Sequence, residues 1–158
     1  MQLGMWDPMG IMADGSTERI EIFRECEVKH GRVAMLAVVG YIVTYLGVRF
    51  PGAESVPSGF GAVNALLQTP EYHNVLYQMM LFFIVGEIWN HDKTGKAEFP
   101  GDFRNDIHDF GWAKQSDAWK QSMRAKELNN GRAAQMGILA LMTHDAMGNV
   151  DAILPWAN

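Results

Sequence analysis

The chain has 158 residues, one cysteine and a formal net charge of −5 at pH 7. A single cysteine excludes an internal disulfide framework, and the acidic balance argues against nucleic acid as a partner. The sequence contains no glycine-rich phosphate loop and no common hydrolase or metalloprotease motif, so we expect no enzyme activity.

The first predicted helix covers residues 17–50 and ends before the break at Pro51-Gly52. At 1.5 Å per residue it is about 45 Å long, which is enough to cross a bilayer while tilted. It carries Glu27, His30 and Arg32 at the point where an apolar stretch begins. Charged side chains in such a position are costly and indicate a specific role.

The second predicted helix covers residues 70–92, with Thr69 as N-cap and Pro70 at the first helical position. Its apolar run contains Gln78 and Glu87. No basic residue lies within one turn of Glu87, so we expect this acid to be protonated, hydrogen-bonded or coordinated. Gln78 lies nine positions earlier, about 180° round the helix, and would serve a different face.

The third predicted helix covers residues 118–147 and repeats the polar pattern of the first. Three residues have counterparts one hundred positions later: Glu27, His30 and Arg32 correspond to Glu127, Asn130 and Arg132. Small residues recur in both copies at three- and four-residue spacing, as close helix packing in lipid prefers. His144 follows Asn130 by fourteen positions, about four turns, so the two share a face.

The repeat predicts how the charges are neutralised. A Glu and an Arg five positions apart point about 140° away from each other, so neither helix neutralises its own pair well. If the two helices cross as a pseudo-twofold pair, Glu27 meets Arg132 and Arg32 meets Glu127. Ion pairs of this kind add little stability but can define register. Each carboxylate then keeps a lone pair beside the neutral donor three positions on, which suits the magnesium of a chlorophyll.

The basic residues predict a topology. With three crossings, twelve of the thirteen Lys and Arg residues fall on the side that holds the N-terminus, and only Arg49 falls on the other. The positive-inside rule places the N-terminus on the cytoplasm-equivalent side. We therefore predict an all-α membrane protein with three transmembrane helices, the first and third crossed, in a single domain of residues 1–158.

The repeat, the segment Trp6-Asp7-Pro8-Met9-Gly10 and residues 104–112 together resemble the light-harvesting chlorophyll a/b-binding superfamily. Details point to its chlorophyll a/c branch of fucoxanthin- and peridinin-binding proteins. The resemblance covers nearly the whole chain except the loop of residues 51–68. It implies a light-harvesting antenna protein that binds chlorophylls and carotenoids and transfers excitation energy to a photosystem.

The resemblance also implies the pigments and their contacts. The cofactors are chlorophyll a, chlorophyll c, carotenoids of the peridinin, fucoxanthin or diadinoxanthin type, and lipids. The expected magnesium ligands are Glu27, His30, Glu87, Glu127, Asn130 and His144, with Gln78 as a further chlorophyll contact. The expected carotenoid anchors are Trp6, Asp7 and Asp145, at the ends of two grooves between the crossed helices. Arg32 and Arg132 supply the structural ion pairs.

The same resemblance implies a location and partners. We expect the chloroplast thylakoid membrane with a stromal N-terminus, and contacts with a photosystem I or II core and neighbouring antenna proteins. Two other functions remain open. A photoprotective family member would dissipate energy, with excited-state lifetimes that shorten sharply at low pH. A pigment-free membrane bundle would use the Glu–Arg pairs and the histidines structurally, and would be colourless when purified.

Overall fold

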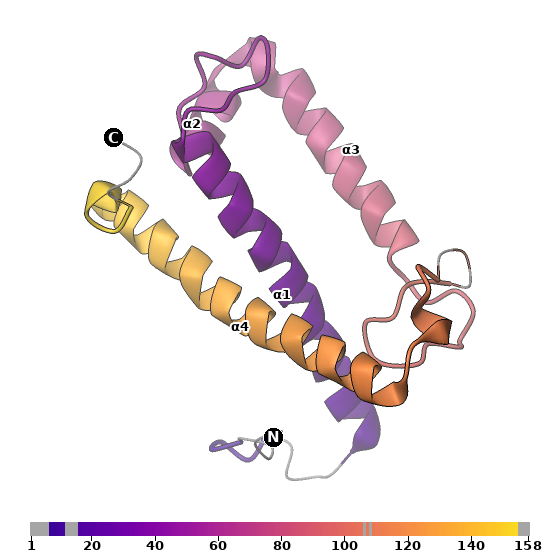
Figure 1. The fold of residues 1–158 in the computed structure, drawn as a ribbon. Coiled ribbons are helices and arrows are strands. Elements are labelled where there is room, and N and C mark those ends of the chain that lie inside the picture. The colour runs from indigo at the N-terminus through magenta and orange to yellow at the C-terminus, as the bar shows by residue number, and fades with distance from the viewer. Residues whose placement is uncertain (1–6, 12–15, 106, 108, 155–158) are drawn as a thin grey trace.

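The computed structural model describes residues 7–11, 16–105, 107 and 109–154. Over these ranges all regular secondary structure is helical, which confirms an all-α fold for this part of the chain. The α-helices are α1 (Thr17–Tyr45), α2 (Gly61–Gln68), α3 (His73–Trp89) and α4 (Asp117–Met147), and the 3₁₀ turns are Pro70–Tyr72, Trp112–Lys114 and Val150–Ala152. The two long helices α1 and α4 cross, while α3 stands to one side (Figure 1).

Helix α1 begins as the sequence predicts but ends earlier. The Ser16 hydroxyl accepts a hydrogen bond from the backbone N–H of Arg19 at 3.4 Å and caps the first turn. The helix was expected to continue to residue 50 but ends at Tyr45. Gly47 adopts a φ of +84° and donates its N–H to the carbonyl of Thr44 at 3.1 Å. This left-handed glycine ends the helix before the proline does.

The segment expected to be a loop, residues 51–68, contains the short helix α2. Its eight residues begin with glycine and have no side-chain cap. Helices this short depend on packing, here against the start of α3, rather than on local signals. The predicted second helix is also shorter than expected, because Pro70–Tyr72 forms a 3₁₀ turn and α3 itself spans His73–Trp89.

The crossing of α1 and α4 is a contact between two backbones. A Cβ atom placed on Gly31 would lie 2.9 Å from the Cα of Gly131, and one placed on Gly131 would lie 2.9 Å from the Cα of Gly31. Both glycines are buried. The equal distances agree with the predicted pseudo-twofold arrangement, and only glycine leaves room for so close an approach.

A small core closes the other end of the crossing. Tyr41 of α1 and Leu141 of α4, which are again one hundred positions apart, are each only 6% exposed. Val150 and Leu154, which follow α4, complete the cluster. The crossed pair is thus joined by backbone contact at the glycines and by side-chain packing near its far end.

Helix α3 carries apolar side chains on all sides and leaves them uncovered. Apart from Leu76, which is partly buried, their exposed fractions run from 42% at Val75 to 74% at Phe82. A helix that is apolar all round requires apolar surroundings. Within the described ranges, no helix combines the length and the apolar character that crossing a membrane demands. The three membrane spans therefore stay a prediction.

Replacing Gly131 with alanine should weaken the crossing, because the added methyl would overlap the Gly31 backbone. We expect a loss of about 1–3 kcal/mol in the free energy of unfolding, the usual cost of overpacking. Gly40→Ala is the control, because no heavy atom lies within 4 Å of the added carbon apart from the chain neighbours and backbone of its own helix. Urea unfolding followed by helical circular dichroism in mild detergent measures both variants. Equal effects would show that the glycine contact does not determine the packing.

Candidate functional site

Two ion pairs join α1 and α4 on either side of the glycine contact. Arg32 Nε donates to Glu127 Oε1 at 2.6 Å, and Arg132 Nε donates to Glu27 Oε1 at 2.6 Å. Both cross-helix pairs expected from the repeat are present. The two carboxylate side chains are half-buried, with 29% of Glu27 and 32% of Glu127 exposed.

The surroundings of the two pairs differ although the backbones are nearly symmetric. Glu27 receives a second cation, because Arg24 Nη1 lies 3.2 Å from its Oε2. Arg32 makes further contacts with the loop before α4, since its Nη1 donates to the carbonyl of Gly101 at 2.8 Å. Its guanidinium also lies 5.7 Å from the ring centre of Phe103. Arg32 therefore contacts a carboxylate, a backbone carbonyl and an aromatic ring. The side chain of Arg132 is more exposed to solvent than that of Arg32.

His30 and Asn130 occupy matching exposed positions beside these pairs. His30 Nδ1 lies 2.7 Å from the carbonyl oxygen of Cys26, one turn earlier. A carbonyl only accepts, so Nδ1 carries the proton and the lone pair of the neutral ring is on Nε2. A backbone carbonyl commonly orients a metal-binding histidine in this way. His30 can thus offer Nε2 to a metal without losing an existing contact.

His144 has a similar arrangement near the end of α4. Its Nδ1 lies 2.9 Å from Asn149 Oδ1, which leaves Nε2 as the acceptor nitrogen. The hydrogen bond joins the last turn of α4 to the segment after it. A histidine that caps the end of a helix and a histidine that ligates a metal can both make this hydrogen bond.

Glu87 has a partner that the sequence did not indicate. Lys29 of α1 forms an ion pair with Glu87 Oε2 on α3. Glu87 was expected to be protonated, hydrogen-bonded or coordinated, and the structure shows a hydrogen bond whose donor comes from another helix, 58 positions away. Among the described residues this is the hydrogen bond that connects α1 to α3. Gln78 is exposed on α3.

Of the three expected carotenoid anchors, two can be described. Asp145 accepts hydrogen bonds from the Tyr41 hydroxyl at 2.9 Å and from the backbone N–H of Phe60 at 3.1 Å. It therefore ties α4 to α1 and to the start of α2. Asp7 Oδ1 accepts from the N–H of Ile11 at 3.0 Å within a turn. Trp6 lies outside the described residues.

The loop between α3 and α4 is held together by charge. Arg104 donates to buried Asp102 through Nε at 2.7 Å and Nη2 at 2.6 Å. The Arg104 guanidinium lowers the pKa of the Asp102 carboxyl to about 2. Glu98 accepts from Trp112 Nε1 at 2.7 Å and from Lys120 of α4 at 3.2 Å. The same loop accepts the hydrogen bond of Arg32 through the Gly101 carbonyl.

The residues that the sequence analysis missed fall into two groups. Arg24 could have been found, because the repeat extends three positions before each glutamate and places Arg24 opposite Arg124. Lys29 gave no such signal, since its partner Glu87 lies in α3, which is not related to α1 by the repeat. Tyr41 gave none either, because its partner Asp145 is 104 positions away and not its counterpart at one hundred.

The chain matches the family model described as chlorophyll A-B binding protein over residues 1–146. It therefore belongs to this family, as the resemblance indicated.

Similar curated proteins belong to its fucoxanthin branch. The chain is 45% identical over 154 residues to fucoxanthin-chlorophyll a-c binding protein A, chloroplastic, of Phaeodactylum tricornutum, with 92% of this chain and 76% of that protein covered. It is 44% identical over 155 residues to the chloroplastic fucoxanthin-chlorophyll a-c binding protein of Trieres chinensis, covering 92% and 75%. Protein B of Macrocystis pyrifera is 40% identical over 158 residues, covering 93% and 70%.

The two ion pairs should contribute unequally to stability. Arg32→Gln removes an ion pair, a hydrogen bond to Gly101 and a ring contact, so we expect it to cost about 2–3 kcal/mol in the free energy of unfolding. Arg132→Gln should cost at most about 1 kcal/mol, because Arg132 is 54% exposed and Arg24 still pairs with Glu27. Urea unfolding of the two variants side by side gives the comparison. Equal losses would mean that the loop contacts of Arg32 add nothing.

Proposed function

We propose that this protein is a light-harvesting antenna that binds chlorophylls a and c and a fucoxanthin-type carotenoid and delivers excitation energy to a photosystem. The observation that carries the proposal is the crossed pair α1 and α4. Its carboxylates are neutralised by arginines of the opposite helix, and neutral donors stand beside them on exposed faces. Family membership and the names of the relatives support the same function.

The donor set fits the proposed pigments. The magnesium of a chlorophyll needs one axial ligand, and histidine nitrogen, amide oxygen and carboxylate oxygen can each supply it. We assign this role to Glu27, Glu127, Glu87, His30, Asn130 and His144, with Gln78 as a further contact. Bound chlorophylls and carotenoids supply the light absorption and the energy transfer, while the protein supplies positions and orientations and catalyses no bond change.

Each carboxylate in this set already has a counter-charge on another helix. Arg132, Arg32 and Lys29 neutralise Glu27, Glu127 and Glu87 respectively. A carboxylate has about four lone-pair sites, so one ion pair leaves acceptor capacity for a metal. A neutralised pair also enters an apolar environment at lower cost than a lone carboxylate. The cross-helix pairs therefore make acidic ligands compatible with the apolar pigments around them.

The exposed apolar side chains provide the surfaces on which pigments and lipids would rest. Besides α3, the outward side chains of Val33, Leu36, Met136 and Leu139 are between 53% and 74% exposed. We place α1, α3 and α4 across the thylakoid membrane, with the N-terminus and the loop before α4 on the stromal side. The distribution of basic residues supports this topology. Trp6, Asp7 and Asp145 are assigned to the ends of the carotenoids, and a photosystem core and neighbouring antenna proteins are the proposed partners.

Pigment analysis and fluorescence excitation of the protein isolated in mild detergent test the function. We expect several chlorophylls per chain and an excitation spectrum of chlorophyll emission that contains the carotenoid bands. The same pigments mixed in detergent without protein are the control and should show no carotenoid sensitisation. A colourless preparation that is fully helical would contradict the proposal and favour a pigment-free bundle.

A variant pair tests the assignment of His30. His30→Leu removes the Nε2 lone pair and should lose one chlorophyll relative to the unchanged protein, because leucine cannot ligate magnesium. His30→Gln retains a neutral oxygen donor and should keep most of that chlorophyll. Pigment-to-protein ratios after identical purification provide the measurement, with helical circular dichroism to confirm folding. If His30→Leu keeps its full pigment complement, His30 is a surface residue and not a ligand.

A further inference from the structure

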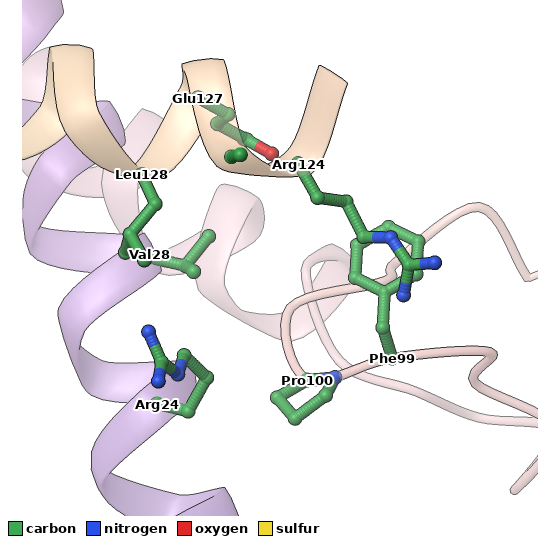
Figure 2. A pocket seen from close by; sticks show the side chains of 8 residues that line it. Arg24, Val28, Phe99, Pro100, Arg124, Glu127 and Leu128 are labelled. Atoms are coloured by element: carbon green, nitrogen blue, oxygen red, sulfur yellow. The ribbon is translucent and has the colours of Figure 1, made fainter. Parts of the chain in front are cut away.

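A cavity of about 220 Å³ lies where α1, α4 and the loop before α4 meet. Two of its walls are arginine side chains, Arg24 from α1 and Arg124 from α4 (Figure 2). The rest of its lining is mostly apolar and includes Val28, Leu128, Phe99 and Pro100. The cavity is therefore polar at its arginines and apolar between them.

The two arginines are counterparts in the repeat, but only one has a carboxylate partner. Arg24 lies 3.2 Å from Glu27 Oε2, three positions further along α1. Arg124 stands three positions before Glu127, yet the Glu127 carboxylate pairs with Arg32 instead. The Arg124 guanidinium lies 4.8 Å from the ring centre of Phe99. No hydrogen bond or ion pair joins Arg124 to any other described residue.

This arrangement leaves a cation uncompensated. Arg124 Nε is buried and has no hydrogen-bond acceptor among the described residues. Buried donors without acceptors are rare and unfavourable, and a partly buried guanidinium favours an anion with several oxygens, such as a phosphate or a sulfonate. The Glu127 carboxylate also lines the cavity, but Arg32 neutralises it. The net charge that faces a ligand is therefore positive.

The apolar lining identifies what kind of anion fits. An inorganic anion gains nothing from Val28, Leu128 and Pro100, whereas a molecule with a charged head and a hydrocarbon chain uses both parts of the lining. Basic pockets between helices on the positive side of a membrane bind anionic lipid headgroups. In the proposed topology this cavity opens on that side, near the membrane surface.

We propose that the cavity binds the phosphate or sulfonate headgroup of an anionic membrane lipid, with Arg124 as its principal contact and Val28 and Leu128 against the start of the acyl chain. The inference rests on the proposed membrane-embedded function. It assigns a role to Arg124, which takes part in neither of the two cross-helix ion pairs.

The test compares Arg124→Gln with Lys126→Gln, two variants of α4 that lose the same charge. Lys126 is exposed and does not line the cavity. Each protein is exchanged into nanodiscs of equal parts phosphatidylglycerol and phosphatidylcholine, re-isolated in mild detergent and analysed for bound lipid by mass spectrometry. Chlorophyll content is measured on the same samples, so that a failure of the proposed function is seen separately.

We expect phosphatidylglycerol retained by the unchanged protein and by Lys126→Gln to fall about fivefold or more in Arg124→Gln, with chlorophyll content unchanged in all three. Equal retention in the two variants, or equal loss from both, would overturn the proposal. A second measurement distinguishes a lipid from a free anion. If inorganic phosphate displaces the retained phosphatidylglycerol, the site recognises a phosphate alone and the proposal of a lipid site is wrong.

Discussion

The closest approach of the two long helices, at Gly31 and Gly131, is the constraint on which the rest of the molecule depends. With a Cβ-to-Cα separation of only 2.9 Å, no side chain fits between the backbones. The short separation brings the residues four positions before and one position after each glycine within reach of the other helix. Glu27 and Arg132, and likewise Arg32 and Glu127, meet for this reason. A wider crossing would break both cross-helix ion pairs at the start of two apolar stretches.

The same backbone symmetry supports two unequal environments. The loop before α4 rests on Arg32, and its internal pair of Asp102 and Arg104 gives it a fixed shape. Among the described residues no loop contacts Arg132 in this way, and Arg132 is more exposed than Arg32. Such asymmetry makes the Glu27 and Glu127 carboxylates distinguishable, both in the access of water and in the charge around each of them.

Features encoded locally or by the repeat could be predicted from the sequence, and features that depend on unrelated elements could not. Ser16 caps α1, and the Glu–Arg exchange follows from helix geometry once the repeat is recognised. The early end of α1 at Tyr45 depended on one glycine that competes with a proline four positions later. The Lys29–Glu87 pair joins two helices that share no repeat, so no spacing in the chain indicates it. The hydrogen bond of Tyr41 joins the two repeated helices, but Asp145 lies 104 positions away and not at the hundred-position counterpart.

The hundred-residue separation of the crossing partners has a consequence for synthesis. The ribosome makes the N-terminal part of the chain first, so α1 is synthesised well before Arg132. Closing a loop of this length also carries an entropic cost that local contacts do not have. In the interval Arg24, on the same helix, is the one described partner available to Glu27. By contrast, Arg32 has already been synthesised when its partner Glu127 is made. The N-terminal copy thus has a counter-ion on its own helix, whereas the C-terminal copy pairs with an arginine that is made before it.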